Sequence, residues 1–159
     1  MTTASETGAA PTSPAPARRV DALLEHYGQS HTHPTNELIH FIAIPLIMLS
    51  LVGMIYALHP WAAYAFLAAS LVYYIRLSVP FLAAMAVVTL AMLGVIQALD
   101  SAGILVKASV AIFVVSWIFQ FIGHKLEGKK PSFFEDIQYL WVGPLFVLSK
   151  LFLKLGVRW

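Results

Sequence analysis

The 159-residue sequence contains no cysteine. This absence excludes disulfides, thiolate ligands for zinc or iron–sulfur clusters, and any catalytic thiol. Charged residues are also scarce, at 11% of the chain against about 25% in a typical soluble domain. The formal net charge is only +2, and the basic residues stand near the ends of apolar runs instead of forming an even cationic surface. Nucleic acid is therefore not an expected partner.

Long hydrophobic runs are what the sequence has in abundance. Hydrophobic residues make up 59% of the chain, and the mean hydropathy is +0.77. A membrane-spanning helix needs roughly 20 mostly apolar residues, and four runs reach or approach that length: 38–58, 61–77, 80–99 and 103–123. Short links containing Pro, Gly or Asp separate them, so neighbouring helices are expected to form antiparallel hairpins. We predict an all-α, polytopic membrane bundle with four spanning helices.

The two ends of the chain are expected to differ from these spans. Residues 1–19 are rich in Ala, Pro, Ser and Thr and predict a disordered N-terminal tail, which leaves residues 20–159 as a single membrane domain. A fifth apolar run, 139–155, carries Lys150 and Lys154 four residues apart, which gives a helix there a charged stripe. The stripe favours a C-terminal helix in the membrane interface, and a fifth span is the alternative.

The basic residues also predict how the chain is oriented. In a four-span topology one side of the membrane receives Arg18, Arg19, Arg76, Lys125, Lys129 and Lys130. Cytoplasmic loops are enriched in Lys and Arg, so we expect a cytoplasmic N-terminus in a plasma (inner) membrane or, in a eukaryote, in an organelle membrane. The same topology brings residues 26–40 and the segment around His124 to one membrane face.

The stretch HYGQSHTHPTNELIH, residues 26–40, holds four of the six histidines and directly precedes the first apolar run. Pro34 predicts the first turn of a helix, because proline suits the first helical position. Thr32 or Thr35 is the expected cap. An ionisable side chain in or at the edge of a membrane helix is expensive, so His40, like His124 in the fourth run, indicates a functional site. His26 and His33 could equally be solvated loop residues.

Polar residues on this stretch and on a later one share helix faces. Asn36 and His40 are four residues apart, and Gln120, His124 and Glu127 follow the spacing i, i+4, i+7. Neutral imidazole is the commonest metal ligand in proteins, and amide or carboxylate groups orient it. We interpret the two faces as a mononuclear, histidine-rich metal site. A di-iron carboxylate centre is disfavoured, because the interiors of the second and third runs contain no carboxylate.

Two other interpretations stay open on the residues alone. One is a non-catalytic membrane protein that binds a metal or a lipid. The other is a structural helical module whose histidines titrate with pH. Dependence of an activity on added iron(II) would distinguish an enzyme from both.

Two motifs give the sequence a resemblance to a known family, the small membrane proteins related to the fungal 2-hydroxy fatty acid dioxygenase. The first motif is similar to the family's N-terminal signature and consists of Tyr27-x-x-x-His31, Pro34, Asn36, His40 and Pro45. The second motif resembles the family's other signature and consists of Gln120-Phe-Ile-Gly-His124, an acid, and then Pro131. Both occur in the family's order, and the resemblance covers about residues 20–155.

The resemblance implies an activity and a set of site residues. The implied protein is an iron(II)-dependent dioxygenase of lipid α-oxidation. It uses dioxygen to shorten a 2-hydroxy fatty acid by one carbon, and it is surrounded by membrane lipid. The implied iron ligands and catalytic residues are His31, His40 and His124, with His33 and Glu127 as further candidates. The residues implied to support these ligands are Tyr27, Asn36 and Gln120.

Overall fold

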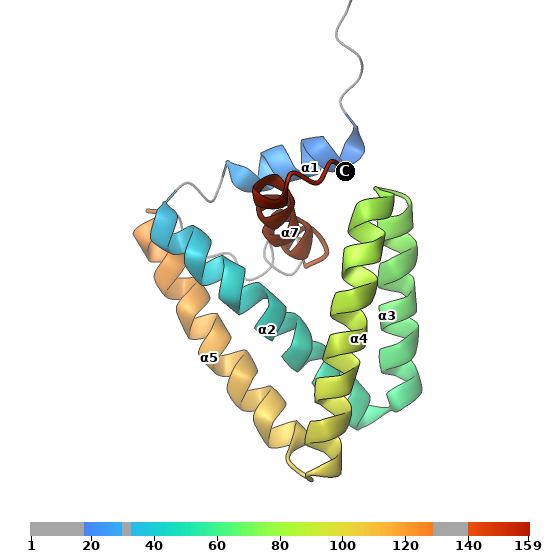
Figure 1. The fold of residues 1–159 in the computed structure, drawn as a ribbon. Helices are drawn as coiled ribbons and strands as arrows, with labels where there is room; N and C mark the ends of the chain where they lie inside the picture. Colours follow the sequence, from blue (N-terminus) through green and yellow to red (C-terminus); the bar gives the residue numbers. More distant parts are fainter. Residues whose placement is uncertain (1–17, 30–32, 129–139) are drawn as a thin grey trace, which may run out of the picture.

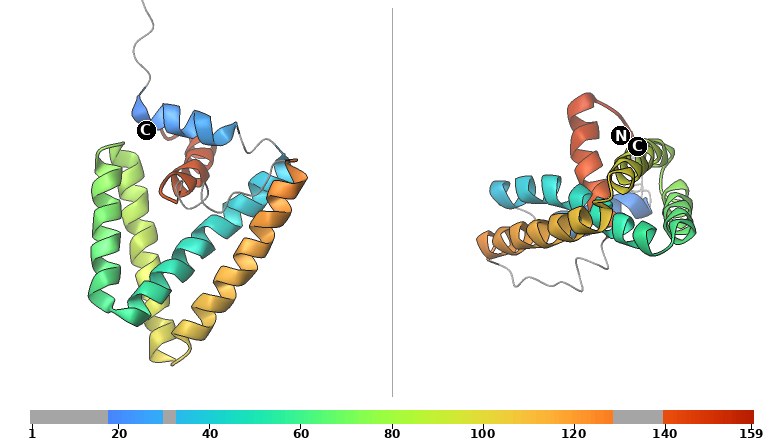
Figure 2. Two further views of the ribbon diagram at one scale, coloured as in Figure 1. Left: turned by 180° about the vertical axis from the view of Figure 1, so that it is seen from behind. Right: turned by 90° about the horizontal axis from the view of Figure 1, so that it is seen from below.

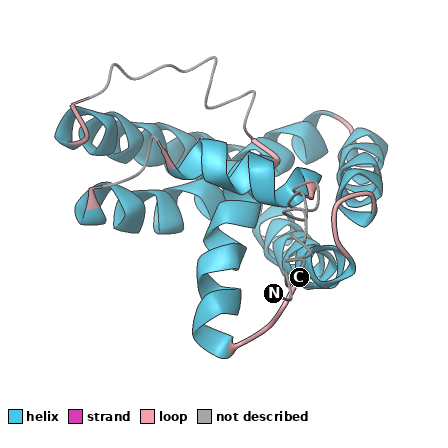
Figure 3. Cartoon of the chain, turned by 90° about the horizontal axis from the view of Figure 1, so that it is seen from above, coloured by secondary structure: helices cyan, strands magenta, loops and turns pink. Residues whose placement is uncertain are grey.

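A computed structural model of the chain describes residues 18–29, 33–128 and 140–159. These residues form helices and no strands (Figures 1 and 3). The helices are α1 (Arg19–Gly28), α2 (Pro34–Leu58), α3 (Pro60–Ile75), α4 (Val79–Ser101), α5 (Leu105–Leu126) and α7 (Val142–Leu155). The predicted all-α bundle is confirmed, whereas the predicted tail, 1–19, lies almost entirely outside the described residues.

The helix boundaries follow from the residues between the apolar runs. His59 is extended and Pro60 opens α3, because proline supplies a helical φ but cannot continue the preceding helix. Ser78 is likewise extended ahead of Val79 and Pro80 at the start of α4. Gly103 has a φ of 69°, a left-handed conformation that glycine adopts without steric strain. The three predicted breaks are thereby confirmed.

The long helices form two arms that meet at one end (Figures 1 and 2). One arm consists of α2 and α5, which make the most extensive helix–helix contact in the described structure, and the other consists of α3 and α4. The α2–α3 and α4–α5 links lie together where the arms meet. At the other end the arms diverge, and α1 and α7 lie across the opening. The first turns of α2 and the last turns of α5 are therefore neighbours at this open end.

Two hydrophobic clusters hold the arms together. The cluster nearer the closed end joins α2, α3, α4 and α5 through Val52, Ala63, Leu67, Ile96 and Leu105. The other cluster joins α1 and α7 to α2, α3 and α4 through Val20, Met48, Tyr74, Phe81, Met85, Met92, Leu145 and Phe152. The two short helices are thus part of the core.

The outer surfaces of the arms are strongly apolar. Large hydrophobic side chains such as Leu90, Val79 and Leu58 are 70% or more exposed, which is expected where the surrounding solvent is lipid. Helices α2, α4 and α5 are long and apolar enough to cross a membrane. Helix α3 has 16 residues, or roughly 24 Å at 1.5 Å per residue, and is shorter than the bilayer core of about 30 Å. The prediction of a fourth span therefore rests on α3 and stays a prediction.

Helix α7 is short and is anchored to the α3–α4 arm. Its 14 residues extend roughly 21 Å, which is too short for a fifth span. The indole Nε1 of Trp141 donates to Ser70 Oγ at 2.8 Å, and the Tyr74 hydroxyl donates to the carbonyl of Trp141 at 3.1 Å. Because α7 is short and lies at the open end of the bundle (Figure 1), the structure favours the interfacial C-terminal helix over the fifth span.

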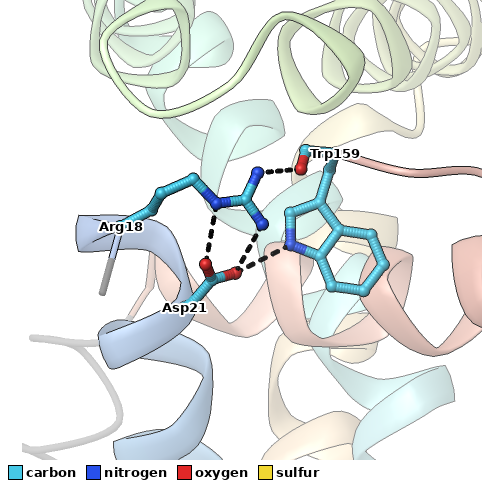
Figure 4. A network of polar contacts seen from close by, with 3 residues as sticks. All are labelled: Arg18, Asp21 and Trp159. Carbon is cyan, nitrogen blue, oxygen red and sulfur yellow. Dashed lines mark hydrogen bonds and ion pairs between the residues drawn. The ribbon is translucent and has the colours of Figure 1, made fainter. Parts of the chain in front are cut away.

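A polar contact connects α1 to the C-terminal segment (Figure 4). Arg18 donates to Asp21 with its Nε at 2.8 Å and to the backbone oxygen of Trp159 with its Nη1. The Trp159 indole donates to Asp21 at 3.2 Å and packs against the rings of Phe81 and Phe152. Helix α1 was not predicted from the sequence, because it contains no long apolar run. These contacts hold α1 over the open end of the bundle.

The cap of α2 differs from the prediction. Pro34 is the first residue of the helix, as predicted, but the cap is His33, whose Nδ1 accepts the backbone N–H of Thr35 at 3.2 Å. The prediction that Thr35 is the cap is wrong, because Thr35 already lies inside the first helical turn. Thr32 lies outside the described residues.

Candidate metal centre

His40 and His124 meet inside the bundle at its open end. His40 lies on the second turn of α2 and His124 on the last turns of α5, and their side chains are 1% and 6% exposed. The ring centroids are 5.1 Å apart, and the ring planes are at 89°. Residues separated by more than 80 positions are thus in edge-to-face contact. The hairpin topology predicted that they lie at the same end of the bundle, but it did not predict this contact.

A backbone hydrogen bond sets which nitrogen of His40 carries a proton. Its Nδ1 lies 2.9 Å from the carbonyl oxygen of Asn36, one turn earlier on α2. A carbonyl can only accept, so Nδ1 must donate, and in the neutral ring the lone pair is on Nε2. Metal-binding histidines are commonly fixed in this way by a carbonyl partner. The tautomer of His40 is therefore suited to ligation through Nε2.

Glu127 ties the end of α5 to the start of α2. Its Oε2 accepts two hydrogen bonds, from the backbone N–H of His33 and from Nδ2 of Asn36, both at 2.9 Å. A carboxylate at a helix N-terminus also interacts favourably with the helix dipole. Asn36 is fully buried and links the two contacts, since its side chain bonds Glu127 and its carbonyl bonds His40. These bonds orient the His40 ring and hold the start of α2 against the end of α5, which carries His124.

Gly123 explains why the two helices can come so close at this point. A Cβ built at Gly123 would overlap Oδ1 of Asn36 and contact Cγ2 of Ile39 at 3.5 Å. Glycine is therefore favoured here by the close approach of the buried Asn36 side chain, not by an unusual φ. The Gly-His dipeptide of the second motif thus brings α5 against Asn36 and places His124 beside His40.

Buried oxygen atoms line the same helix interface. Oδ1 of Asn36, Oε1 of Gln120 and Oγ of Ser116 have no hydrogen-bond partner among the described residues. Gln120 and Ser116 are 3% exposed and lie one and two turns before His124 on the face of α5 that meets α2. Buried unpaired polar atoms are rare in proteins and commonly mark a bound water or ligand. The polar interface therefore has capacity for further ligands.

Tyr27 and His33 make other contacts, and His31 is not among the residues that the structure describes. The Tyr27 ring is buried against Phe146 of α7, with ring centroids 5.1 Å apart. His33 is exposed and serves as the helix cap described above. His31 lies outside the described residues. Ligation by His31, His33 or Glu127 stays a prediction.

The chemistry of the donor set can be compared with the iron that the sequence resemblance implies. Within residues 18–29, 33–128 and 140–159, no group of three or more His, Asp or Glu side chains is placed to hold a metal ion. These residues supply two buried imidazoles, and nitrogen ligands of this kind suit iron(II). The donor set fits the implied iron if at least one further ligand comes from elsewhere.

A helical bundle with long apolar helices and a buried histidine pair at one end defines a candidate metal centre in a membrane protein. The chain belongs to the family described as 2-hydroxy-palmitic acid dioxygenase Mpo1-like, whose model matches residues 17–155. It is also 29% identical, over 139 residues, to the 2-hydroxy-palmitic acid dioxygenase MPO1 of Saccharomyces cerevisiae. That match covers 84% of this chain and 79% of the yeast protein. No solved structure matches the chain.

Replacing Glu127 tests its positioning role. Glu127→Ala leaves the N–H of His33 and the amide of Asn36 without their acceptor, so we expect a loss of about 1–3 kcal/mol in the free energy of unfolding. In a site that holds the iron implied by the sequence resemblance, iron affinity and turnover should fall about 10- to 100-fold, as for other groups that orient ligands. Thermal unfolding in detergent, metal titration and product formation measure these effects.

The matched control is Glu25→Ala, because Glu25 is an exposed carboxylate on α1. This variant should behave like the wild type in all three measurements. Glu127→Gln retains an amide oxygen that can accept, and we expect it to recover part of the loss. The contradicting result is a Glu127→Gln protein that is stable but binds iron as poorly as Glu127→Ala. Glu127 would then be an iron ligand instead of a positioning residue.

Proposed function

We propose that this protein is an iron(II)-dependent dioxygenase that shortens 2-hydroxy fatty acids by one carbon. The observation that carries the proposal is the buried pair of His40 and His124, found in a chain of the Mpo1-like family. The overall oxidation balances with one dioxygen: a 2-hydroxy acid gives the acid one carbon shorter, carbon dioxide and water. Dioxygen is the only oxidant that this balance requires.

The proposed iron ligands are His40 and His124, with His31 as the third and with His33 and Glu127 as further candidates. Bound iron(II) would supply open positions for dioxygen and for the hydroxyl and carboxylate oxygens of the substrate, together with the redox chemistry. His40 is prepared for ligation because its Nδ1 donates to Asn36. Asn36 and Glu127 then act as positioning residues that hold α2 against α5.

Helices α2 and α5 also offer room for an alkyl chain. An apolar cavity of about 240 Å³ lies between them, and its lining includes Ile39, the residue before His40. Its lining consists of Leu38, Ile39, Ile42, Ala43, Leu46, Val115, Ser116 and Phe119. A chain in this cavity would stay in a lipid-like environment while the polar head faced the histidine pair. We propose that the protein is integral to a plasma or organelle membrane, with the N-terminus and the site on the cytoplasmic side.

Product analysis tests this function. Protein purified without oxygen and loaded with iron(II) should convert 2-hydroxyhexadecanoic acid, on addition of air, to the fatty acid one carbon shorter. Mass spectrometry detects that product, and hexadecanoic acid, which lacks the hydroxyl group, serves as the substrate control. Full iron occupancy without the shortened acid would instead support the non-catalytic metal- or lipid-binding alternative.

A further inference from the structure

A groove of about 560 Å³ lies between the first turns of α2 and the C-terminal half of α7. It combines an apolar bed with three charged side chains. The residues that line it are Pro34, Glu37, Leu38, Phe41, Lys150, Leu151, Leu153 and Lys154. This composition suits an amphiphile that has one anionic group and a hydrocarbon chain.

The charges of the groove are not balanced. Lys150 Nζ lies 3.1 Å from Oε1 of Glu37 and 5.1 Å from the centre of the Phe146 ring, so its charge is already engaged. Lys154 follows one turn later and is exposed, and it makes no ion pair among the described residues. One carboxylate and two ammonium groups leave one positive charge available, which matches a single carboxylate ligand.

The groove and the histidine pair lie on adjacent faces of α2. Asn36 and His40 are buried towards α5, whereas Glu37 and Phe41, each the next residue along α2, face the groove. Leu38 lines both this groove and the apolar cavity between α2 and α5. A ligand in the groove therefore lies at the open end of the bundle, next to both the cavity and the candidate metal centre.

We propose that this groove is a docking site for the carboxylate of a free fatty acid, which is held there before it reaches the histidine pair. Lys154 contacts the carboxylate, and the alkyl chain lies over Leu38, Phe41 and Leu151. The long stem of lysine can lie along the apolar bed while its ammonium group stays at the membrane surface. The choice of a 2-hydroxy fatty acid as the physiological ligand rests on the function proposed above.

Equilibrium binding without turnover tests the docking site. The full chain is placed in nanodiscs of neutral phosphatidylcholine, without oxygen, and binding of radiolabelled 2-hydroxyhexadecanoic acid is measured. Lys154→Gln should weaken binding about fivefold, the upper range for an exposed ion pair, and Lys154→Arg should restore it. Glu37→Gln should strengthen binding two- to fivefold, because it releases Lys150. The charge-matched control is Lys107→Gln at the start of α5, far from the groove, which should leave binding unchanged.

Two results would overturn this docking site. One is equal affinity of the Lys154→Gln and wild-type proteins for the acid. The other is displacement of the acid by phosphatidylglycerol at equal concentration, which would assign the groove to an anionic phospholipid. Because the assay involves no turnover, binding can be established even if the proposed reaction fails. If turnover is present, Lys154→Gln should raise KM without lowering kcat, whereas a change in kcat alone would contradict docking.

Discussion

Replacing either His40 or His124 by alanine should lower the turnover of 2-hydroxy fatty acid at least about 100-fold and abolish stoichiometric iron binding. The physical reason is that each variant removes one of two buried imidazoles, whereas loss of a mere supporting group already reduces metal affinity 10- to 100-fold. Product formation and iron content per protein are measured on protein extracted from the membrane fraction.

The matched control is His59→Ala. His59 is exposed and lies between α2 and α3, at the opposite end of the bundle. This variant should keep wild-type iron content and turnover. Substitution of a buried ring also leaves a cavity, so thermal unfolding of each variant has to accompany the assay. Folded His40→Ala and His124→Ala proteins that both retain full turnover would remove these residues from the catalytic site.

Gly123→Ala should damage both stability and activity. The added Cβ overlaps Oδ1 of Asn36, so either the Asn36–Glu127 hydrogen bond breaks or α5 moves away from α2. Overpacking of this kind costs about 1–3 kcal/mol in the free energy of unfolding. His124 is the adjacent residue, so we expect iron affinity and turnover to fall more than about tenfold, within the range for groups that orient ligands.

Gly94→Ala provides the control for Gly123→Ala. Gly94 lies in the middle of α4, and a Cβ added there meets no atom within 4 Å. Alanine is the better helix former by up to about 1 kcal/mol, so this variant should be neutral or more stable. Equal behaviour of the two variants in unfolding and turnover would show that the close approach at Gly123 is unimportant.

The helices could be predicted because each depends on local sequence. Apolar runs of about 20 residues gave α2, α4 and α5, and the turn chemistry of Pro60 and Gly103 gave their limits. Helix α1 escaped prediction because its ten residues have no apolar run, and it is held in place by tertiary contacts of Asp21 and Trp159. A short helix of this kind depends on packing more than on its own propensity.

The candidate site was partly predictable for a related reason. Counting spans is enough to place His40 and His124 at the same end of the bundle, and helical spacing places Asn36 and Gln120 on the correct faces. Spacing says nothing about which atoms meet between two helices. The two hydrogen bonds of Glu127 depend on the interhelical distance that only the fold supplies.

The structure also gave new roles to residues that the sequence had presented differently. Lys150 and Lys154 predicted a charged stripe, but the pairing of Lys150 with Glu37 follows from the packing of α7 beside α2. His33 was a candidate ligand, and the structure shows that its ring caps α2, a role that we had predicted for a threonine. Imidazole can accept a hydrogen bond as a hydroxyl does, so motif reading alone could not separate these roles.

X-ray absorption at the iron edge tests the central claim most directly. Protein loaded with iron(II) in the absence of oxygen should show scattering from at least two imidazole ligands. His40→Ala and His124→Ala, examined at the same iron content if they retain any, should each lose one imidazole from that signal. Iron surrounded only by oxygen ligands, or an imidazole signal that is unchanged in both variants, would contradict a metal centre built on this histidine pair.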